Sequence, residues 1–147
     1  MKISNRKAYY EYNIIKEFTC GIKLLGSEVK SLRNGEANLQ DSYCYVFNNE
    51  VFVKGLHISK NKMSSYNNHE EKRDRKLLLT KKEIRNIISE TKANNGMTII
   101  PLEIFESNGK FKIKISLAKG KKLHDKKSHL KEKDIISQVR RETNFNI

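Results

Sequence analysis

The chain has 147 residues, which suffices for one domain around a single modest core. It carries 30 lysines and arginines against 17 aspartates and glutamates, and the net charge of +13 favours polyanionic partners, with nucleic acid first and an anionic membrane surface second. No window approaches the ~20 apolar residues of a membrane span and the N-terminus has no apolar stretch of signal-peptide length, so we expect a cytoplasmic protein that does not enter a membrane.

The first half of the chain is predicted to form strands and one short helix. Residues 12–22 show a β-like pattern, and residues 26–36 are typical of a short helix. Ser27 is expected to cap the start of this helix and Gly35 to end it.

Residues 43–58 contain the clearest predicted β-hairpin. Its turn is expected at residues 48–49, because both are asparagines and asparagine tolerates positive φ. Alternating aromatic residues follow one another along its first strand: Tyr43, Tyr45 and Phe47. Alternating aromatics normally face inward, so core packing is favoured over the alternative of a base-stacking platform.

The second half is predicted to begin with a long polar loop over residues 59–76. The best helix follows, with Thr80 and Glu83 as a capping box and Gly96 as its end.

Two strands are predicted around the turn at residues 107–109. In the second strand apolar residues alternate with lysines, so one face should be buried and the other cationic. Pro101 falls within the first strand and should mark an edge or a bulge. The sum, about six strands and two helices, predicts an α+β, mainly β domain that closes as a small antiparallel barrel.

A basic tail is predicted to follow the barrel. We therefore divide the chain into a barrel domain, residues 1–118, and a tail, residues 119–147, which holds nine basic and four acidic residues. An isolated helix of about 15 residues is marginal in water, so we expect the tail to be disordered when free and to order on a partner.

Signatures of metal binding are weak, and no glycine-rich phosphate loop is complete. The pair His69-Glu70 lacks the second histidine of a zinc-protease helix. Cys20 and Cys44 lack partners at metal-ligand spacing and are expected to be reduced thiols. We therefore predict no metal and no cofactor.

The pair His124-Asp125 within the tail allows three interpretations. A flexible cationic stretch does not enclose a general base, so a solvated histidine is favoured over a catalytic pair. A third interpretation fits better, in which the imidazole stacks on a nucleobase while neighbouring lysines neutralise phosphates.

The other cationic segments allow two interpretations each. The lysines of residues 110–116, together with those at the start of the tail, are either solubilising or phosphate-binding. The same ambiguity applies to three residues at the end of the polar loop: Arg73, Arg75 and Lys76.

Five stretches carry a resemblance to a known family: NRKA at 5–8, GSEVKSLRNGEANLQDSY at 26–43, HIS at 57–59, RKLLLTKKEI at 75–84 and LAKGKKLHDKK at 117–127. In this order and spacing they make the chain similar to the SsrA-binding (small protein B) family along almost its whole length. The resemblance implies a barrel related to the oligonucleotide-binding fold with flanking helices. It also implies a role without catalysis, in which the protein binds the tRNA-like domain of transfer-messenger RNA (tmRNA, SsrA RNA) and, with elongation factor Tu, carries it to stalled ribosomes for trans-translation.

The same resemblance implies two groups of contact residues. Those expected to face tmRNA are Asn5, Lys30, Arg33, Asn38, Lys112, Lys119, Lys121 and Lys122. Those expected at the decoding region, where the tail would enter the empty messenger channel and meet ribosomal RNA, are His124, Asp125, Lys126 and Lys127.

Two alternatives stay open at this stage. One is a general single-stranded-RNA or ribosome-associated binding protein, and the other is a small ribonuclease that uses His124 or His57. Cleavage of labelled RNA that depends on His124 would favour the ribonuclease over the adaptor.

Overall fold

The computed structural model describes residues 2–60 and 68–121. Within these ranges the chain forms nine strands and three helices, and the paired strands are antiparallel. In chain order they are β1 (Lys2–Ser4), α1 (Arg6–Glu11), β2 (Tyr12–Ile22), α2 (Gly26–Arg33), β3 (Ala37–Asn38), β4 (Tyr43–Phe47), β5 (Glu50–Lys54), β6 (His57–Ile58), β7 (Arg75–Leu78), α3 (Lys81–Ala93), β8 (Met97–Ser107) and β9 (Lys110–Gly120).

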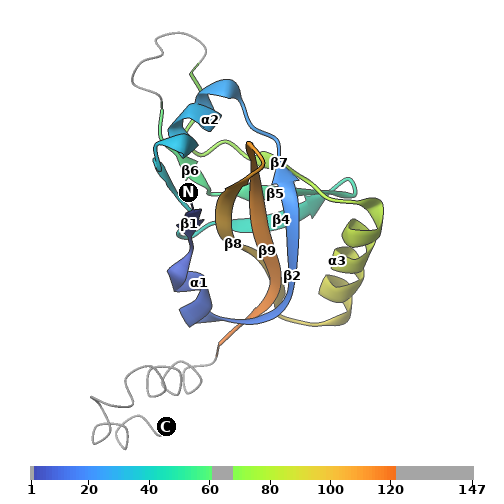
Figure 1. Cartoon of the computed structure of the whole chain (residues 1–147). Helices are drawn as coiled ribbons and strands as arrows, with labels where there is room; N and C mark the ends of the chain where they lie inside the picture. Colours follow the sequence, from blue (N-terminus) through green and yellow to red (C-terminus); the bar gives the residue numbers. More distant parts are fainter. Residues whose placement is uncertain (1, 61–67, 122–147) are drawn as a thin grey trace, which may run out of the picture.

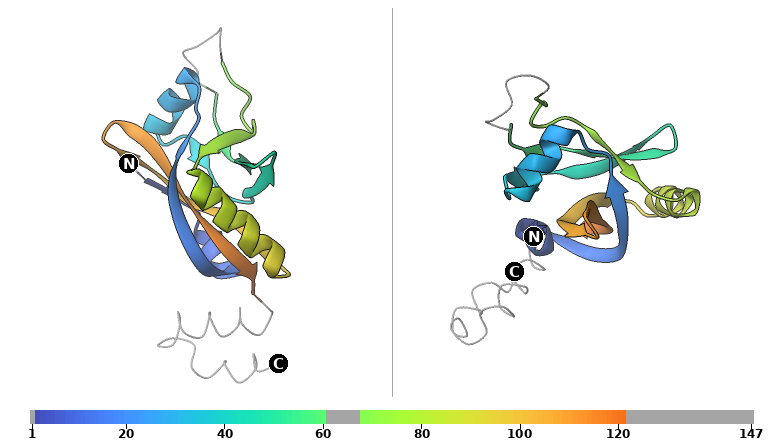
Figure 2. Two further views of the ribbon diagram at one scale, coloured as in Figure 1. Left: turned by 90° about the vertical axis from the view of Figure 1, so that its right-hand side faces the viewer. Right: turned by 45° about the horizontal axis from the view of Figure 1, so that its top comes forward.

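The main sheet closes on itself. Its strand order is β1-β8-β4-β5-β7-β2-β9, and β9 also pairs with β8. The strands from β8 round to β9 therefore form a ring, and the helices lie outside it (Figure 1, Figure 2). This arrangement confirms the predicted α+β, mainly β fold, and closure pairs strands that would otherwise expose their edges.

The ring encloses an apolar core. Val51 and Val53 of β5 and Ile113 and Ile115 of β9 are fully buried on its inner side, and Leu32 of α2 packs against the same cluster. Burying an aliphatic side chain of this size contributes about 1.5–3 kcal/mol, so the alternating strands supply the main stabilisation.

Tight turns set the register of the two predicted hairpins. Asn48 and Asn49 have φ of 50° and 58°, and Asn108 and Gly109 have φ of 52° and 76°. Positive φ at both central positions is typical of type I′ turns, whose twist matches that of the flanking strands. Both hairpins are confirmed, although the second strand of the first one ends at Lys54.

Helix α3 begins as predicted. The Glu83 N–H donates to Thr80 Oγ1 at 3.2 Å, and the Thr80 N–H donates to Glu83 Oε1 at 2.9 Å, so the capping box is complete. The helix ends at Ala93, before Gly96, and buries Ile87. Among the described residues, no helix has the length and apolar character needed to cross a membrane.

Several short elements differ from the prediction. The sequence pattern missed α1, β1 and β3, because each is too short to show a period. Strand β6 falls inside the second strand predicted for the first hairpin, but it is a separate strand that pairs with β3. Strand β7 begins at Arg75, inside the segment predicted as a loop. The expectation for Ser27 is wrong: Leu25 is the N-cap of α2, and its N–H donates to Glu28 Oε1 at 2.8 Å.

Pro101 marks a bulge, as predicted. The register between β8 and β9 shifts between Pro101 and Glu103. Because proline has no N–H to donate, an irregularity in the ladder is the position where a paired strand tolerates it.

The aromatic row on β4 faces the other way from the favoured prediction. Tyr43 is 45% exposed and Phe47 is 61% exposed, whereas Cys44 between them is buried. Tyr45 stacks on Phe52 at a centroid distance of 5.5 Å and its hydroxyl donates to Asp74 at 2.6 Å. A period of two fixes which residues share a face but not which face is inside, so the expected core packing is wrong here.

Candidate nucleic-acid interface

The predicted tmRNA-facing residues fall into two groups at opposite ends of β9. Strand β9 begins at the β8–β9 turn, on the side of α2, and ends on the side of α1 (Figure 1). Lys112 belongs to the first part of this strand and Lys119 to its last part. Seven residues of extended strand span about 23 Å. The structure therefore separates the predicted set into an α2 end, which holds Lys30, Arg33 and Lys112, and an α1 end, which holds Asn5, Lys119 and Lys121. Lys110, which was not in the predicted set, also lies at the α2 end.

The α2 end presents cations above a shallow apolar hollow. Leu32 anchors α2 in the core and leaves Lys30 and Arg33 exposed. The hollow, of about 310 Å³, is lined by residues of β2, α2, β7 and the β8–β9 turn, and Lys110 and Lys112 form its rim. Arg33 Nε lies 3.9 Å from Glu106 Oε2, a contact of α2 with the end of β8.

The cationic face of β9 is shorter than its alternation suggested. Lys114 Nζ lies 3.6 Å from Glu103 and 3.9 Å from Glu17, so two carboxylates compensate this lysine. Lys110 and Lys112 form no ion pair with any described residue. Their charges are therefore available to a phosphate, whereas that of Lys114 is largely committed.

A buried network of ion pairs connects α2, through Glu28, to Arg73 and Arg75. Arg75 is 0% exposed, and its Nε donates to Glu28 Oε2 at 2.6 Å while its Nη1 donates to the Leu56 carbonyl at 2.8 Å. Arg73 Nη2 donates to the other oxygen, Glu28 Oε1, at 2.9 Å. Of the three basic residues left ambiguous by the sequence, Arg75 is thus a structural residue that phosphate cannot reach.

The pKa of Glu28 depends on two opposing effects, burial and hydrogen bonding. Burial by itself raises the pKa of the carboxyl group, but the hydrogen bonds from Arg73, Arg75 and the Leu25 N–H outweigh it and leave the pKa of Glu28 below its ordinary value. The Glu28 carboxylate therefore stays charged at neutral pH. It connects α2 to Arg73 and to Arg75, the first residue of β7.

A histidine fixes the other side of α2. His69 Nε2 donates to the Ile58 carbonyl at 2.8 Å, so in the neutral ring Nδ1 accepts the hydroxyl of Ser27, also at 2.8 Å. His69 is buried. The Ser27 hydroxyl bonds to this histidine and does not cap α2. Sequence reasoning missed both roles, because a lone histidine next to a glutamate signals only an incomplete metal motif.

Asn38 lies on the small sheet beside this network. It pairs with His57 across β3 and β6, and its Oδ1 accepts the N–H of Gln40 at 2.8 Å. The residue is exposed, which leaves its amide nitrogen as a donor toward solvent. His57 Nε2 lies 3.5 Å from Glu71 Oε2, and both side chains are accessible to solvent.

At the α1 end, Asn5 is an anchor rather than a surface group. It is 6% exposed, its Nδ2 donates to the Pro101 carbonyl at 3.0 Å, and its N–H donates to the Leu102 carbonyl at 2.8 Å. Ala8 then packs on Ile100 of β8. These contacts hold α1 against the bulged part of β8.

The last described residues of the chain run past α1. Lys119 belongs to β9, and Lys121 donates from its N–H to the Glu11 carbonyl at 2.8 Å and from Nζ to the Tyr9 carbonyl at 3.2 Å. Strand β9 continues to Gly120, two residues past the predicted domain boundary. Lys122 and the predicted decoding-region group, residues 124–127, lie outside the described residues.

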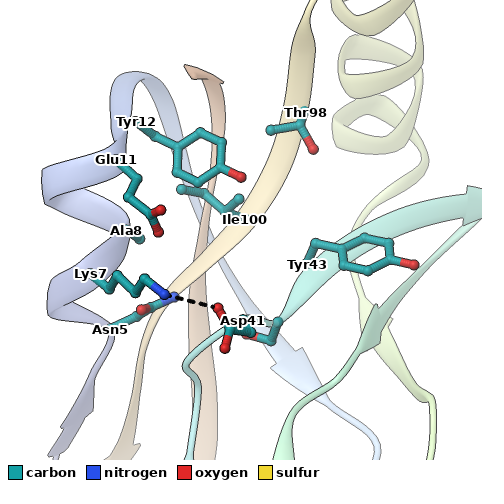
Figure 3. A pocket seen from close by; sticks show the side chains of 10 residues that line it. Asn5, Lys7, Ala8, Glu11, Tyr12, Asp41, Tyr43, Thr98 and Ile100 are labelled. Carbon is teal, nitrogen blue, oxygen red and sulfur yellow. Dashed lines mark hydrogen bonds and ion pairs between the residues drawn. The ribbon is translucent and has the colours of Figure 1, made fainter. Parts of the chain in front are cut away.

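A polar hollow of about 410 Å³ opens at the α1 end (Figure 3). Its walls come from α1, from the start of β2, from residues 41–43 and from β8. Lys7 Nζ lies 3.3 Å from Asp41 Oδ1 across its mouth. Unlike the hollow at the α2 end, this one combines both signs of charge with aromatic rings.

The described residues offer no site for a metal ion, since no three histidine, cysteine or acidic side chains gather there. Cys20 and Cys44 are free and buried. Burial, with the nearby Glu83 carboxylate, raises the pKa of Cys20 to about 12, so this thiol stays protonated and unreactive at neutral pH.

Comparison with known proteins places the chain in a family. A family model described as SmpB protein matches residues 2–145. The chain belongs to the SmpB family. The match covers both ends of β9 and extends over the tail, in agreement with the resemblance carried by the sequence motifs.

Individual members of the family are close in sequence and in structure. The SsrA-binding protein of Syntrophobacter fumaroxidans is 52% identical over 130 residues, which are 88% of this chain and 80% of the relative. That of Phocaeicola vulgatus is 47% identical over 135 residues, 91% and 89% of the two chains. A chain in a solved structure described as "tmRNA-SmpB: a journey to the center of the bacterial ribosome" is 37% identical with a TM-score of 0.69, covering 82% of this chain and 85% of that one.

Proposed function

We propose that this protein is an RNA-binding adaptor that binds the tRNA-like domain of tmRNA and delivers it to stalled ribosomes for trans-translation. The observation that carries the proposal is the 37% identity and TM-score of 0.69 to a chain described with tmRNA on the bacterial ribosome. Membership of the SmpB family over residues 2–145 supports the same role. The role is a binding role, in the cytoplasm, with elongation factor Tu as an indirect partner, and it requires no catalytic residue.

The charge distribution suits this task. A structured RNA is recognised through its shape, its phosphates and its 2′-hydroxyls, which calls for an exposed cationic surface rather than a deep pocket. The α2 end supplies Lys30, Arg33 and Lys112 for this purpose, with the donor of Asn38 beside them. Lys119 and Lys121 add positive charge at the other end of β9. Asn5 contributes indirectly, because its hydrogen bond to the Pro101 carbonyl holds α1 against β8.

The tail is assigned the second half of the adaptor role. Residues 119–147 carry nine basic and four acidic residues, and we infer that the part beyond Lys122 enters the messenger channel, where His124 to Lys127 meet ribosomal RNA. A segment that orders only inside an empty channel would report that messenger is absent, because the ordering cost is met only there. Two linked sites of moderate strength then act together through effective concentration.

A single pair of measurements tests the proposal. The full chain should bind a labelled tRNA-like domain of tmRNA with strong salt dependence, and it should support tagging of nascent chains in a reconstituted translation system. A chain truncated after Lys122 should retain most tmRNA binding and lose tagging. Normal tagging by the truncated chain would refute the channel role. RNA cleavage abolished by His124→Ala would refute the adaptor in favour of a ribonuclease.

A further inference from the structure

The hollow at the α1 end has the size and shape of a small-ligand site. Its volume of about 410 Å³ lies within the usual range for such sites, roughly 300–1,000 Å³. Ile100 and Ala8 provide an apolar floor, and the ring of Tyr12 stands beside it, whereas the ring of Tyr43, on the far side of the hollow, points away from α1 (Figure 3). A flat aromatic ligand would therefore meet an aromatic ring and aliphatic carbon on its faces and polar groups at its edge.

Several polar groups in this hollow have no partner in the described part of the protein. The carboxylate of Glu11 and the hydroxyls of Tyr12, Tyr43 and Thr98 form no side-chain hydrogen bond or ion pair with any described residue. Charges and hydroxyls gathered in a concave site without internal partners are available to a ligand.

The positions of Lys7 and Glu11 on α1 indicate which ligand groups the hollow can bind. Lys7 and Glu11 are four residues apart, so they lie on one face of the helix, and both project into the hollow (Figure 3). Asp41 holds the ammonium group of Lys7 at 3.3 Å, which orients this donor beside the free acceptor of Glu11.

A donor next to a carboxylate matches guanine better than the other bases. The Watson–Crick edge of guanine presents one acceptor, O6, followed by two donors, N1–H and the N2 amino group. Lys7 would donate to O6 while the two oxygens of Glu11 accept from N1–H and N2–H. Adenine and cytosine place their amino group where Lys7 requires an acceptor, and uracil offers Glu11 one donor where guanine offers two.

We propose that this hollow receives one unpaired guanine of an RNA, whose base edge is read by Lys7 and Glu11. The choice of RNA rests on the proposed function, and the geometry agrees with it. Lys121 donates from its N–H to the Glu11 carbonyl and from Nζ to the Tyr9 carbonyl, so one ammonium group lies at the end of α1 for an adjoining phosphate. The bound nucleotide would lie where the body of the protein meets the tail.

The test uses the full chain and four RNA hairpins that differ only in a single bulged base, G, A, C or U. Affinities are measured by fluorescence anisotropy at one salt concentration. The guanine bulge should bind about tenfold more tightly than the other three, the scale of discrimination for a two-bond base contact. Equal affinity for the four hairpins would overturn the proposal.

A matched variant assigns the selectivity to the hollow. Glu11→Gln should remove the guanine preference and leave the affinity for the adenine bulge nearly unchanged, because Gln keeps the shape and presents a donor where an acceptor is needed. A guanine preference that survives Glu11→Gln would mean that the base is read elsewhere, which also overturns the proposal.

The two proposals fail separately. A protein that binds the tRNA-like domain of tmRNA but ranks the four bulges equally retains the adaptor role and loses the guanine site. A protein that selects the bulged guanine but does not bind that domain retains the site and loses the adaptor role. Lys112→Ala, at the other end of β9, should weaken all four hairpins equally and leave their ratio unchanged.

Discussion

The two ends of β9 are both cationic, yet they are built for different kinds of recognition. At the α2 end, Lys110 and Lys112 form no ion pair with any described residue, and their neighbours are apolar. At the α1 end, Lys7 is paired with Asp41 and shares its hollow with the carboxylate of Glu11, which has no partner among the described residues, and with the ring of Tyr12. Uncompensated cations attract any polyphosphate, whereas a fixed donor beside an acceptor distinguishes one base edge from another. We therefore propose that the first region supplies affinity for RNA and the second supplies selectivity among bases.

The largest expected effect concerns how the α2 end is supported. Arg75→Ala leaves the buried Glu28 carboxylate with Arg73 as its remaining cation and several carbonyls without a donor. Breaking a buried ion pair in this way typically costs about 3–5 kcal/mol, and we expect a loss of that size in the free energy of unfolding. Urea denaturation followed by circular dichroism measures it. A loss below about 1 kcal/mol, the value of a surface pair, would show that the network does not support α2.

The corresponding support of the α1 end should be weaker. Asn5→Ala removes one hydrogen bond and leaves the Pro101 carbonyl unsatisfied, which costs about 1–3 kcal/mol. Because Asn5 is 6% exposed, the folded variant should bind the tRNA-like domain with nearly unchanged affinity under conditions where the wild type and the variant are both fully folded. A large loss of affinity without a loss of stability would make Asn5 an RNA contact instead of an anchor.

A third comparison separates free from compensated lysines on one strand. Lys112→Ala should lower the affinity for tmRNA and reduce the slope of log affinity against log salt by about one unit. Lys114→Ala is the matched control, since Glu103 and Glu17 already compensate Lys114 at 3.6 and 3.9 Å, and its slope should change little. Equal changes for both variants would mean that the ion pairs of Lys114 do not persist in solution.

The smallest expected effect is a shift in acid stability. The pKa of Glu28 is lower in the folded protein than its ordinary value of 4.5, so its stabilisation is complete above that pH and is lost as the pH falls through the folded pKa. Thermal unfolding between pH 6 and pH 3 should therefore show a smaller decrease in Tm for Glu28→Gln than for the wild type. Parallel decreases would assign the acid sensitivity to other carboxyl groups.

The sequence predicted what local chemistry determines. Asn48-Asn49 and Asn108-Gly109 fix their turns by themselves, and Thr80 with Glu83 fixes the start of α3, so these elements were correct. Elements defined only by a distant partner, such as β1 on β8, carry no local signal and were missed.

The candidate site shows the same division. The exposed cations Lys30, Arg33 and Lys112 follow from composition and motif, but their separation from Lys119 requires the strand register. The sequence left the role of Arg75 ambiguous, because a charged residue is usually exposed. Only the three-dimensional structure shows that Glu28 lies beside Arg75 and compensates its buried charge. The Lys7 and Glu11 pair was invisible because α1 itself was not predicted.

One hydrogen bond at the end of β9 has a mechanical consequence. The Lys121 N–H is bonded to the Glu11 carbonyl, at the last residue of α1. The point where the chain departs from the ring is therefore fixed to the same short helix that carries Lys7. Any occupant that tilts this helix also moves Lys121 and the end of β9, so a displacement of α1 reaches the last described residues without a separate hinge.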